Sequence, residues 1–113
     1  MEKVKKSYTK YRKAALLLRE ISKPENLELL QYIIDTHTTE RLVVEHLTTF
    51  MQSKHGNTFT QAETSTILAA LRSVGLVEAI PDSRWRIYAP TKNADVLLLA
   101  ANTIVTQLDK VNG

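Results

Sequence analysis

The sequence predicts a mainly α-helical domain with about five helices and one small antiparallel β-hairpin. Apolar residues recur at three- and four-residue steps over most of the chain, as expected of helices with one buried face. Residues 76–80 (LVEAI) and 84–88 (RWRIY) depart from this pattern, because they have the character of short strands on either side of a tight turn. The chain also contains only three glycines and three prolines, which favours helices over a loop-rich β design.

The composition indicates a single soluble domain over residues 1–113. A chain of 113 residues can bury roughly two-thirds of its unfolded surface. Its 43% hydrophobic and 24% charged residues are typical of a soluble globular protein, neither disordered nor membrane-spanning. The apolar segment AALLL near the N-terminus is too short and too closely flanked by charge for a signal peptide. We therefore expect a cytoplasmic protein with no membrane partner.

Positive charge is concentrated at the N-terminus. Residues 1–23 hold eight of the 15 basic residues but only two of the 12 acidic ones, although the net charge is only +3. A basic segment of this kind suits a polyanionic partner, and it is equally typical of a solvated end that improves solubility. Residues 1–6 form a basic arm for which disorder is the simplest expectation.

Three helices are predicted before residue 54. The first covers residues 7–21, and Ser22 and Glu25 after it have the spacing of a capping box for the second, residues 24–36. Thr38 or Thr39 can cap a third helix from about residue 40 to residue 53. The residues expected to face inward from the second and third helices are apolar: Leu27, Leu30, Ile33, Ile34, Val43, Val44, Leu47, Phe50 and Met51.

The segment from residue 60 to residue 90 has the clearest local signals. Thr60 and Glu63 have capping-box spacing at the start of a fourth helix. Gly75 stands where a helix needs a left-handed residue to end. Pro81, Asp82 and Ser83 then predict the turn of a hairpin. After the hairpin, Thr91 can cap a last helix over residues 92–110.

The segment Ser65-x-x-Leu68-x-x-Leu71-Arg72-x-x-Gly75-Leu76-Val77, followed by Trp85-x-Ile87-Tyr88, resembles the ArsR/SmtB-like winged helix-turn-helix regulators. MarR-like and PadR-like regulators are neighbouring possibilities. The resemblance extends over the whole order of elements, although the specific residues lie only in this segment. It implies a homodimeric DNA-binding transcriptional regulator, with residues 60–74 as the recognition helix in the major groove and the hairpin as a wing on the DNA backbone.

Helical phase selects the residues that would contact DNA under this interpretation. With Leu68 and Leu71 inward, the outward face of the helix is small and mostly uncharged. Arg84 and Arg86 are expected on one face of the second strand, while Trp85 and Ile87 anchor the wing to the core. The full set of predicted DNA contacts is Lys54, Gln61, Ala62, Thr64, Ser65, Thr66, Ala69, Arg72, Arg84 and Arg86.

A second interpretation stays open. Members of the resembled family often have basic or imidazole side chains where this chain has Thr66, Ile67 and Ala69. The neutral face could therefore seat a partner helix, which would make the domain a protein-interaction module without sequence-specific DNA binding. The connector between the third and fourth helices is also longer than a typical tight turn, so the third helix is expected to extend.

The first and last helices have more apolar surface than one small domain needs to bury. Each carries apolar side chains on more than one side, which requires cover on more than one side. A second copy of the chain is the simplest cover, as the resemblance also implies. Residues 7–22 and 92–110 are the predicted dimerisation helices, and the predicted contacts are Tyr11, Leu18, Leu97, Ala101, Ile104 and Leu108.

Catalysis, metal binding and cofactors find little support in the sequence. The chain has no cysteine, so thiolate chemistry and cysteine metal sites are excluded. Its three histidines, His37, His46 and His55, are scattered, and nothing supplies a nucleophile with an orienting partner. We expect neither an enzyme nor a metal sensor, and the sequence names no effector.

Overall fold

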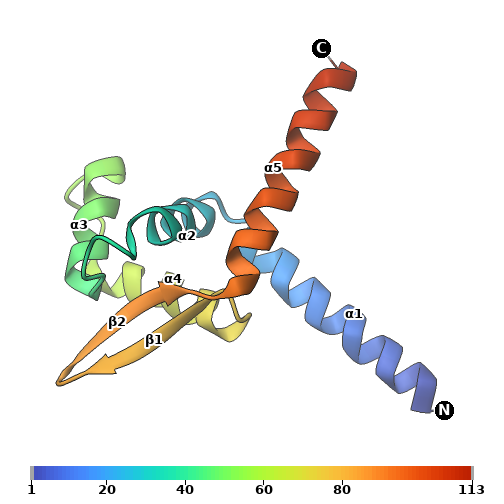
Figure 1. The fold of residues 1–113 in the computed structure, drawn as a ribbon, viewed down its shortest axis with the longest axis horizontal. Helices are drawn as coiled ribbons and strands as arrows, with labels where there is room; N and C mark the ends of the chain where they lie inside the picture. The colour runs from blue at the N-terminus through green and yellow to red at the C-terminus, as the bar shows by residue number, and fades with distance from the viewer. Residues whose placement is uncertain (1, 113) are drawn as a thin grey trace.

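The computed structural model describes residues 2–112, and the side chains of residues 8–110. Its elements follow the predicted order: α1 (Glu2–Ile21), α2 (Pro24–Thr36), α3 (Val44–His55), α4 (Gln61–Ser73), β1 (Val77–Asp82), β2 (Trp85–Pro90) and α5 (Lys92–Asn112). Figure 1 shows α2, α3, α4 and the hairpin gathered into one body, from which α1 and α5 project in different directions. The fold is a winged helix-turn-helix, as predicted.

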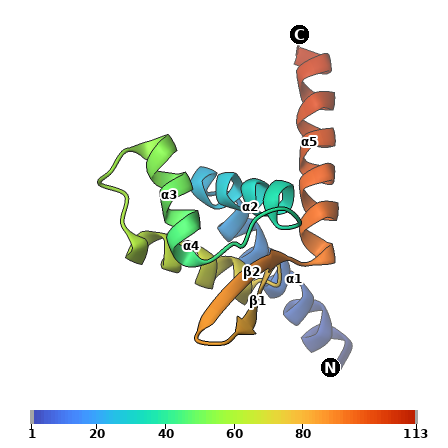
Figure 2. The ribbon, with the colours of Figure 1, turned by 60° about the vertical axis from the view of Figure 1, so that its left-hand side comes forward.

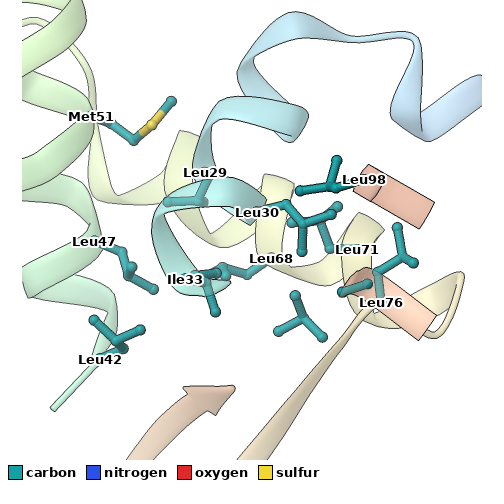
Figure 3. Close-up of a cluster of buried hydrophobic side chains, with 12 residues drawn as sticks. Leu29, Leu30, Ile33, Leu42, Leu47, Met51, Leu68, Leu71, Leu76 and Leu98 are labelled. Carbon is teal, nitrogen blue, oxygen red and sulfur yellow. The ribbon is translucent and has the colours of Figure 1, made fainter. Parts of the chain in front are cut away.

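The core is built around α2. Leu29, Leu30 and Ile33 of this helix are completely buried, although only the last two were expected to face inward. Figure 3 shows these side chains in the middle of the cluster, between residues of α3 and residues of α4 and α5. Each fully buried leucine stabilises the fold by about 1.5–3 kcal/mol. The rest of the cluster comprises Leu42, Leu47, Met51, Leu68, Leu71, Leu76, Val77, Ala94 and Leu98.

Both ends of α4 have the predicted chemistry. Thr60 and Glu63 form a complete capping box, in which each side chain accepts a hydrogen bond from the other residue's backbone amide. At the C-terminus, Gly75 adopts a φ of 80° and its amide donates to the Arg72 carbonyl. The Leu76 amide reaches back to the Leu71 carbonyl at 3.0 Å, which completes a Schellman motif. These contacts fix where the helix stops and the wing begins.

The wing is a two-stranded antiparallel hairpin whose last pair is Asp82 with Trp85. Its loop is therefore Ser83–Arg84, one residue later than the expected turn at Pro81, Asp82 and Ser83. Ser83 supplies the positive φ, 58°, that a two-residue hairpin loop requires at its first position. Pro81 instead lies in the edge strand β1, where a missing amide is tolerated.

The segment before α3 pairs with the wing and shortens the helix. The Tyr88 amide donates to the Leu42 carbonyl at 2.9 Å, and Arg41 forms an ion pair with Asp82 at 2.6 Å. Because β2 holds the Leu42 carbonyl and the Val43 amide donates to the Arg41 carbonyl at 3.1 Å, residues 41–43 are not helical, and α3 begins at Val44 and not near residue 40. Its end at His55 confirms the expected extension. The cap expected from Thr38 or Thr39 was wrong, since the N-cap is Val43 and has no side-chain capping bond.

The predicted cap by Ser22 was wrong, because the N-cap of α2 is Lys23, which makes no side-chain capping bond. The Ser22 hydroxyl donates instead to the Arg19 carbonyl at the end of α1. The Thr91 hydroxyl donates to the Gly75 carbonyl at 2.7 Å and so ties the start of α5 to the end of α4.

A polar junction holds α1 against α2. The Asn26 side chain is buried and donates to the Glu20 carbonyl at 3.0 Å and to the Glu20 carboxylate at 3.3 Å. Arg19 and Lys23 form ion pairs with the same carboxylate at 3.2 and 3.3 Å. Burial raises the pKa of Glu20, but the hydrogen bonds and positive charges of Lys23 and Arg19 outweigh it, and the net pKa is lowered.

Beyond this junction, α1 and α5 leave the body of the fold (Figure 2). α1 begins at Glu2, so the backbone of residues 2–6 continues the helix where a disordered arm was expected. The phosphate contacts that this basic arm could make lie outside the described side chains. No helix among residues 2–112 is long and apolar enough to cross a membrane.

Candidate nucleic-acid interface and self-association surface

The outward face of α4 is exposed, as predicted. Its exposed side chains are Gln61, Ala62, Glu63, Ser65, Thr66, Ala69, Arg72 and Ser73. The side chains are small or neutral apart from Glu63 in the first turn and Arg72 in the last. Eleven residues at 1.5 Å each place Arg72 about 16 Å along the axis from Gln61. A groove entered by the first turns of α4 would therefore meet an amide, hydroxyls and methyl groups, together with the carboxylate of Glu63.

Thr64 does not belong to this face, although it was predicted to contact DNA. Its side chain is fully buried, and its hydroxyl lies 2.9 Å from the hydroxyl of Thr48 on α3. It also donates to the Thr60 carbonyl at 3.3 Å. The residue lies on the inward stripe of α4, one turn before Leu68. Its role is to fix the angle between α3 and α4.

The connector between α3 and α4 is clamped by contacts that the sequence did not reveal. The Gln52 side-chain amide donates to the Phe59 carbonyl at 2.9 Å. His55 Nε2 lies 2.6 Å from a carboxylate oxygen of Glu28 on α2. Lys54 is exposed, as predicted, with its ammonium 5.8 Å from the centre of the Phe50 ring. Lys54 therefore remains a candidate for phosphate contact, whereas His55 is engaged with α2.

The wing arginines are both exposed, but they do not share a strand. Arg84 lies in the hairpin loop, with its guanidinium 5.5 Å from the centre of the Trp85 ring. Arg86 lies on β2 opposite Pro81. Neither arginine forms an ion pair with any side chain among residues 8–110. Two uncompensated guanidinium groups at and beside the tip of a hairpin form a cationic surface suited to phosphate.

Trp85 was predicted to anchor the wing to the core, and this was wrong. Its side chain is 39% exposed at the last strand pair, and it is not among the side chains that pack against the core cluster. Ile87 is half-buried and lies closer to the body of the fold. The ring of Trp85 instead supports Arg84, because a guanidinium over an indole ring is attracted by the ring quadrupole.

Strongly exposed apolar side chains are concentrated on α1 and α5. Tyr11, Leu18, Ile104 and Leu108 are among them, as predicted, with exposures between 55% and 71%. Leu97 and Ala101 differ, since both are half-buried, and Leu97 packs against the core of its own chain. The predicted contacts left out further exposed apolar residues of the same two helices, because helical phase alone does not say which side the core covers. These are Tyr8, Leu16, Val96, Leu99 and Val105.

The histidines are dispersed. The hydroxyl of Tyr32 lies 2.6 Å from His46 Nε2, His55 contacts Glu28, and His37 Nδ1 lies 3.1 Å from the Ile34 carbonyl. Within the described part of the chain, no three histidine, aspartate or glutamate side chains are grouped closely enough to hold a metal ion.

Comparison with known proteins gives a clear answer on fold. No protein-family model matches the sequence, and no curated protein is significantly similar to it. Several solved structures are similar. The DNA-binding domain of Mb0332 from Mycobacterium bovis has a TM-score of 0.73 and 18% identity over 88% of this chain and 84% of that one. NolR from Sinorhizobium fredii has a TM-score of 0.67 and 23% identity over 88% and 90%. HlyU from Vibrio cholerae has a TM-score of 0.62 and 20% identity over 92% and 97%.

Proposed function

We propose that this protein is a DNA-binding transcriptional regulator that acts as a homodimer. The first half of α4 would enter the major groove, and the wing would lie along the DNA backbone. The observation that carries the proposal is the combination of an exposed first half of α4 with two unpaired arginines on the adjoining hairpin. A capping box and a Schellman motif hold both ends of α4, so this surface is rigid.

The similar structures support the proposal. The Mb0332 domain is described as a homodimeric winged helix-turn-helix DNA-binding domain and a possible ArsR-family transcriptional regulator. HlyU from Vibrio vulnificus is described as a transcriptional regulator, and another neighbour as an ArsR-like regulator from Rhodococcus. We therefore infer an ArsR-like regulator and a cytoplasmic location.

Base readout would come from the start of α4. Gln61 can pair with an adenine by two hydrogen bonds, and the methyl groups of Ala62, Thr66 and Ala69 can contact thymine methyls. The Thr66 hydroxyl already donates to the Ala62 carbonyl, so it is presented to the groove mainly as a methyl and an acceptor. These residues predict a preference for A·T pairs in the bases contacted. Ser65, Arg72 and Lys54 would add contacts to the flanking backbone.

The homodimer would form through α1 and α5. Among residues 8–110, nine of the eleven strongly exposed large hydrophobic side chains lie on these two helices, and the other two are on the wing. Large apolar side chains exposed along two helices favour an interaction site on each of them. A second copy is the simplest partner, because isologous contact would cover both helices at once.

The experiment that tests the proposal is selection of binding sites from a random duplex library at moderate salt. We expect enrichment of a palindrome with half-sites about one helical turn apart, matching the two α4 helices of a dimer. The rival function is a protein-interaction module, which the neutral face of α4 also suits. If nothing is enriched and binding to any duplex vanishes near physiological salt, the rival replaces this proposal.

A further inference from the structure

A cavity of about 590 Å³ lies where α1 meets the C-terminal end of α4. It is lined by Lys13, Leu16, Arg19, Arg72, Ser73, Val74 and Gly75. A volume of this size falls in the range of small-molecule sites. The cavity lies at the opposite end of α4 from the residues proposed to read bases, and of the proposed DNA contacts it includes only Arg72, a proposed backbone contact.

Three cations face this cavity. Arg19 has an ion pair with Glu20, but Lys13 and Arg72 have none with any side chain among residues 8–110. The carbonyl groups at the C-terminal end of α4 do not bind Lys13 or Arg72 either. Its carbonyls at Leu71 and Arg72 already accept the amides of Leu76 and Gly75. The cavity therefore has an uncompensated positive charge.

The rest of the lining is apolar except for Ser73, whose hydroxyl donates to the Ala70 carbonyl at 2.7 Å. Leu16 of α1 is 39% exposed, and Val74 is half-buried beside it. Gly75 adds no side chain, and a Cβ at that position would meet nothing within 4 Å, so the space beside it is open. A DNA phosphate would use the cations but not the apolar side chains. A molecule with an anionic head and an apolar body would use both.

We propose that this cavity is a binding site for a small amphipathic oxyanion, a carboxylate or a phosphate monoester with an apolar body. Arg72 presents a planar fork of donors that matches either head group, and Lys13 adds a point charge from the other helix. The apolar body lies against Leu16 and Val74. Because the ligand bridges α1 to α4, it couples the helix proposed for dimerisation to the helix proposed for DNA readout; that coupling, unlike the binding itself, rests on the proposed function.

The test is calorimetric titration of the full-length protein, without DNA, with octanoate and octyl phosphate below their critical micelle concentrations and with 1-octanol below its solubility limit. We expect one oxyanion per chain, with 1-octanol at least about tenfold weaker because it lacks the charge. The tighter of octanoate and octyl phosphate identifies the head group. Lys13→Gln and Arg72→Gln should each weaken oxyanion binding about tenfold, and Arg12→Gln, which removes a charge from α1 outside the cavity, should not change it.

Amide chemical shifts on addition of octanoate locate the site, and we expect changes at residues 13–19 and 72–75. Equal affinity for 1-octanol, shifts confined to residues 96–108, or unchanged affinity in both variants would each overturn the proposal. So would a finding that neither oxyanion binds while the two variants alter dimer dissociation, since a second copy would then fill the cavity. If the protein binds DNA but neither oxyanion, the proposed cavity site is wrong and the proposed function stands. If the protein binds the oxyanion but not DNA, the proposed function is wrong and the cavity site stands.

Discussion

Gly75 is the residue on which the junction between α4 and the wing depends. Its φ of 80° is strained for any residue with a Cβ, yet a Cβ there would meet no other atom within 4 Å. Gly75→Ala should therefore lower the free energy of unfolding by about 1 kcal/mol, through backbone conformation alone. Chemical denaturation of the wild type and the variant measures this loss of stability. Ser73→Ala, two residues earlier on the exposed face, is the matched control and should change stability by less than about 0.5 kcal/mol.

Glu20 gives the fold a dependence on pH. Because its pKa is lowered in the folded protein, its ionised form stabilises the fold above its ordinary value of 4.5, and this contribution is lost as the pH falls through the folded pKa. Glu20→Gln should melt at a lower temperature than the wild type at pH 7. The two proteins should converge as the pH falls through the lowered pKa of Glu20 in the folded protein. A melting difference that stays constant from pH 7 to pH 3 would contradict this account of Glu20.

At the scale of elements, the wing is expected to contribute affinity without specificity. Arg84→Gln combined with Arg86→Gln should weaken binding to all duplexes. It should also flatten the dependence of log affinity on log salt by about 0.9 for each phosphate that the variant no longer neutralises. Fluorescence anisotropy across a salt series measures both. The control removes two other exposed cations, Lys92 and Lys110 of α5, and should leave the slope unchanged. An equal effect of the control would mean that only net charge matters.

The outer half of α5 is expected to pack against a partner subunit. From Asn102 to Lys110 every described side chain is exposed, so this part of the helix has no core of its own to cover. Ile104→Lys with Leu108→Lys should convert a dimer into a monomer while the fold remains intact. Sedimentation equilibrium should give twice the 12.8 kDa chain mass for the wild type and the mass of one chain for the variant.

Thr103→Lys with Gln107→Lys is the matched control, since it adds the same charge at polar positions of the same helix. It should dimerise more strongly than the variant that carries Ile104→Lys and Leu108→Lys. A wild-type protein that sediments as a monomer at micromolar concentration would refute the homodimer and leave the apolar surface of α1 and α5 unexplained.

At the scale of the whole molecule, the architecture has one rigid body and two projecting helices. The three central helices and the wing share a core around α2, and α5 joins it only through its first two turns, at Ala94 and Leu98. The proposed DNA surface therefore lies on the rigid body, and the proposed dimer surface lies on the projecting helices. A ligand between α1 and α4 would act where these two parts meet.

The sequence by itself determined the element order, the capping box at Thr60, the glycine stop at Gly75 and the hairpin. Each of these depends on residues within about six positions of one another, and local hydrogen bonding decides them. The neutral outward face of α4 was also readable, because helical phase follows from Leu68 and Leu71.

The tertiary structure decided what depends on distant partners. The start of α3 was set by the Leu42 carbonyl pairing with Tyr88, and the connector by His55 reaching Glu28. Thr64 faces Thr48 and not solvent, and Leu97 lies against the core and not outward. Periodicity tells which residues share a face of a helix, but only packing decides which of two apolar faces the core covers, because burial is a property of the neighbours and not of the residue.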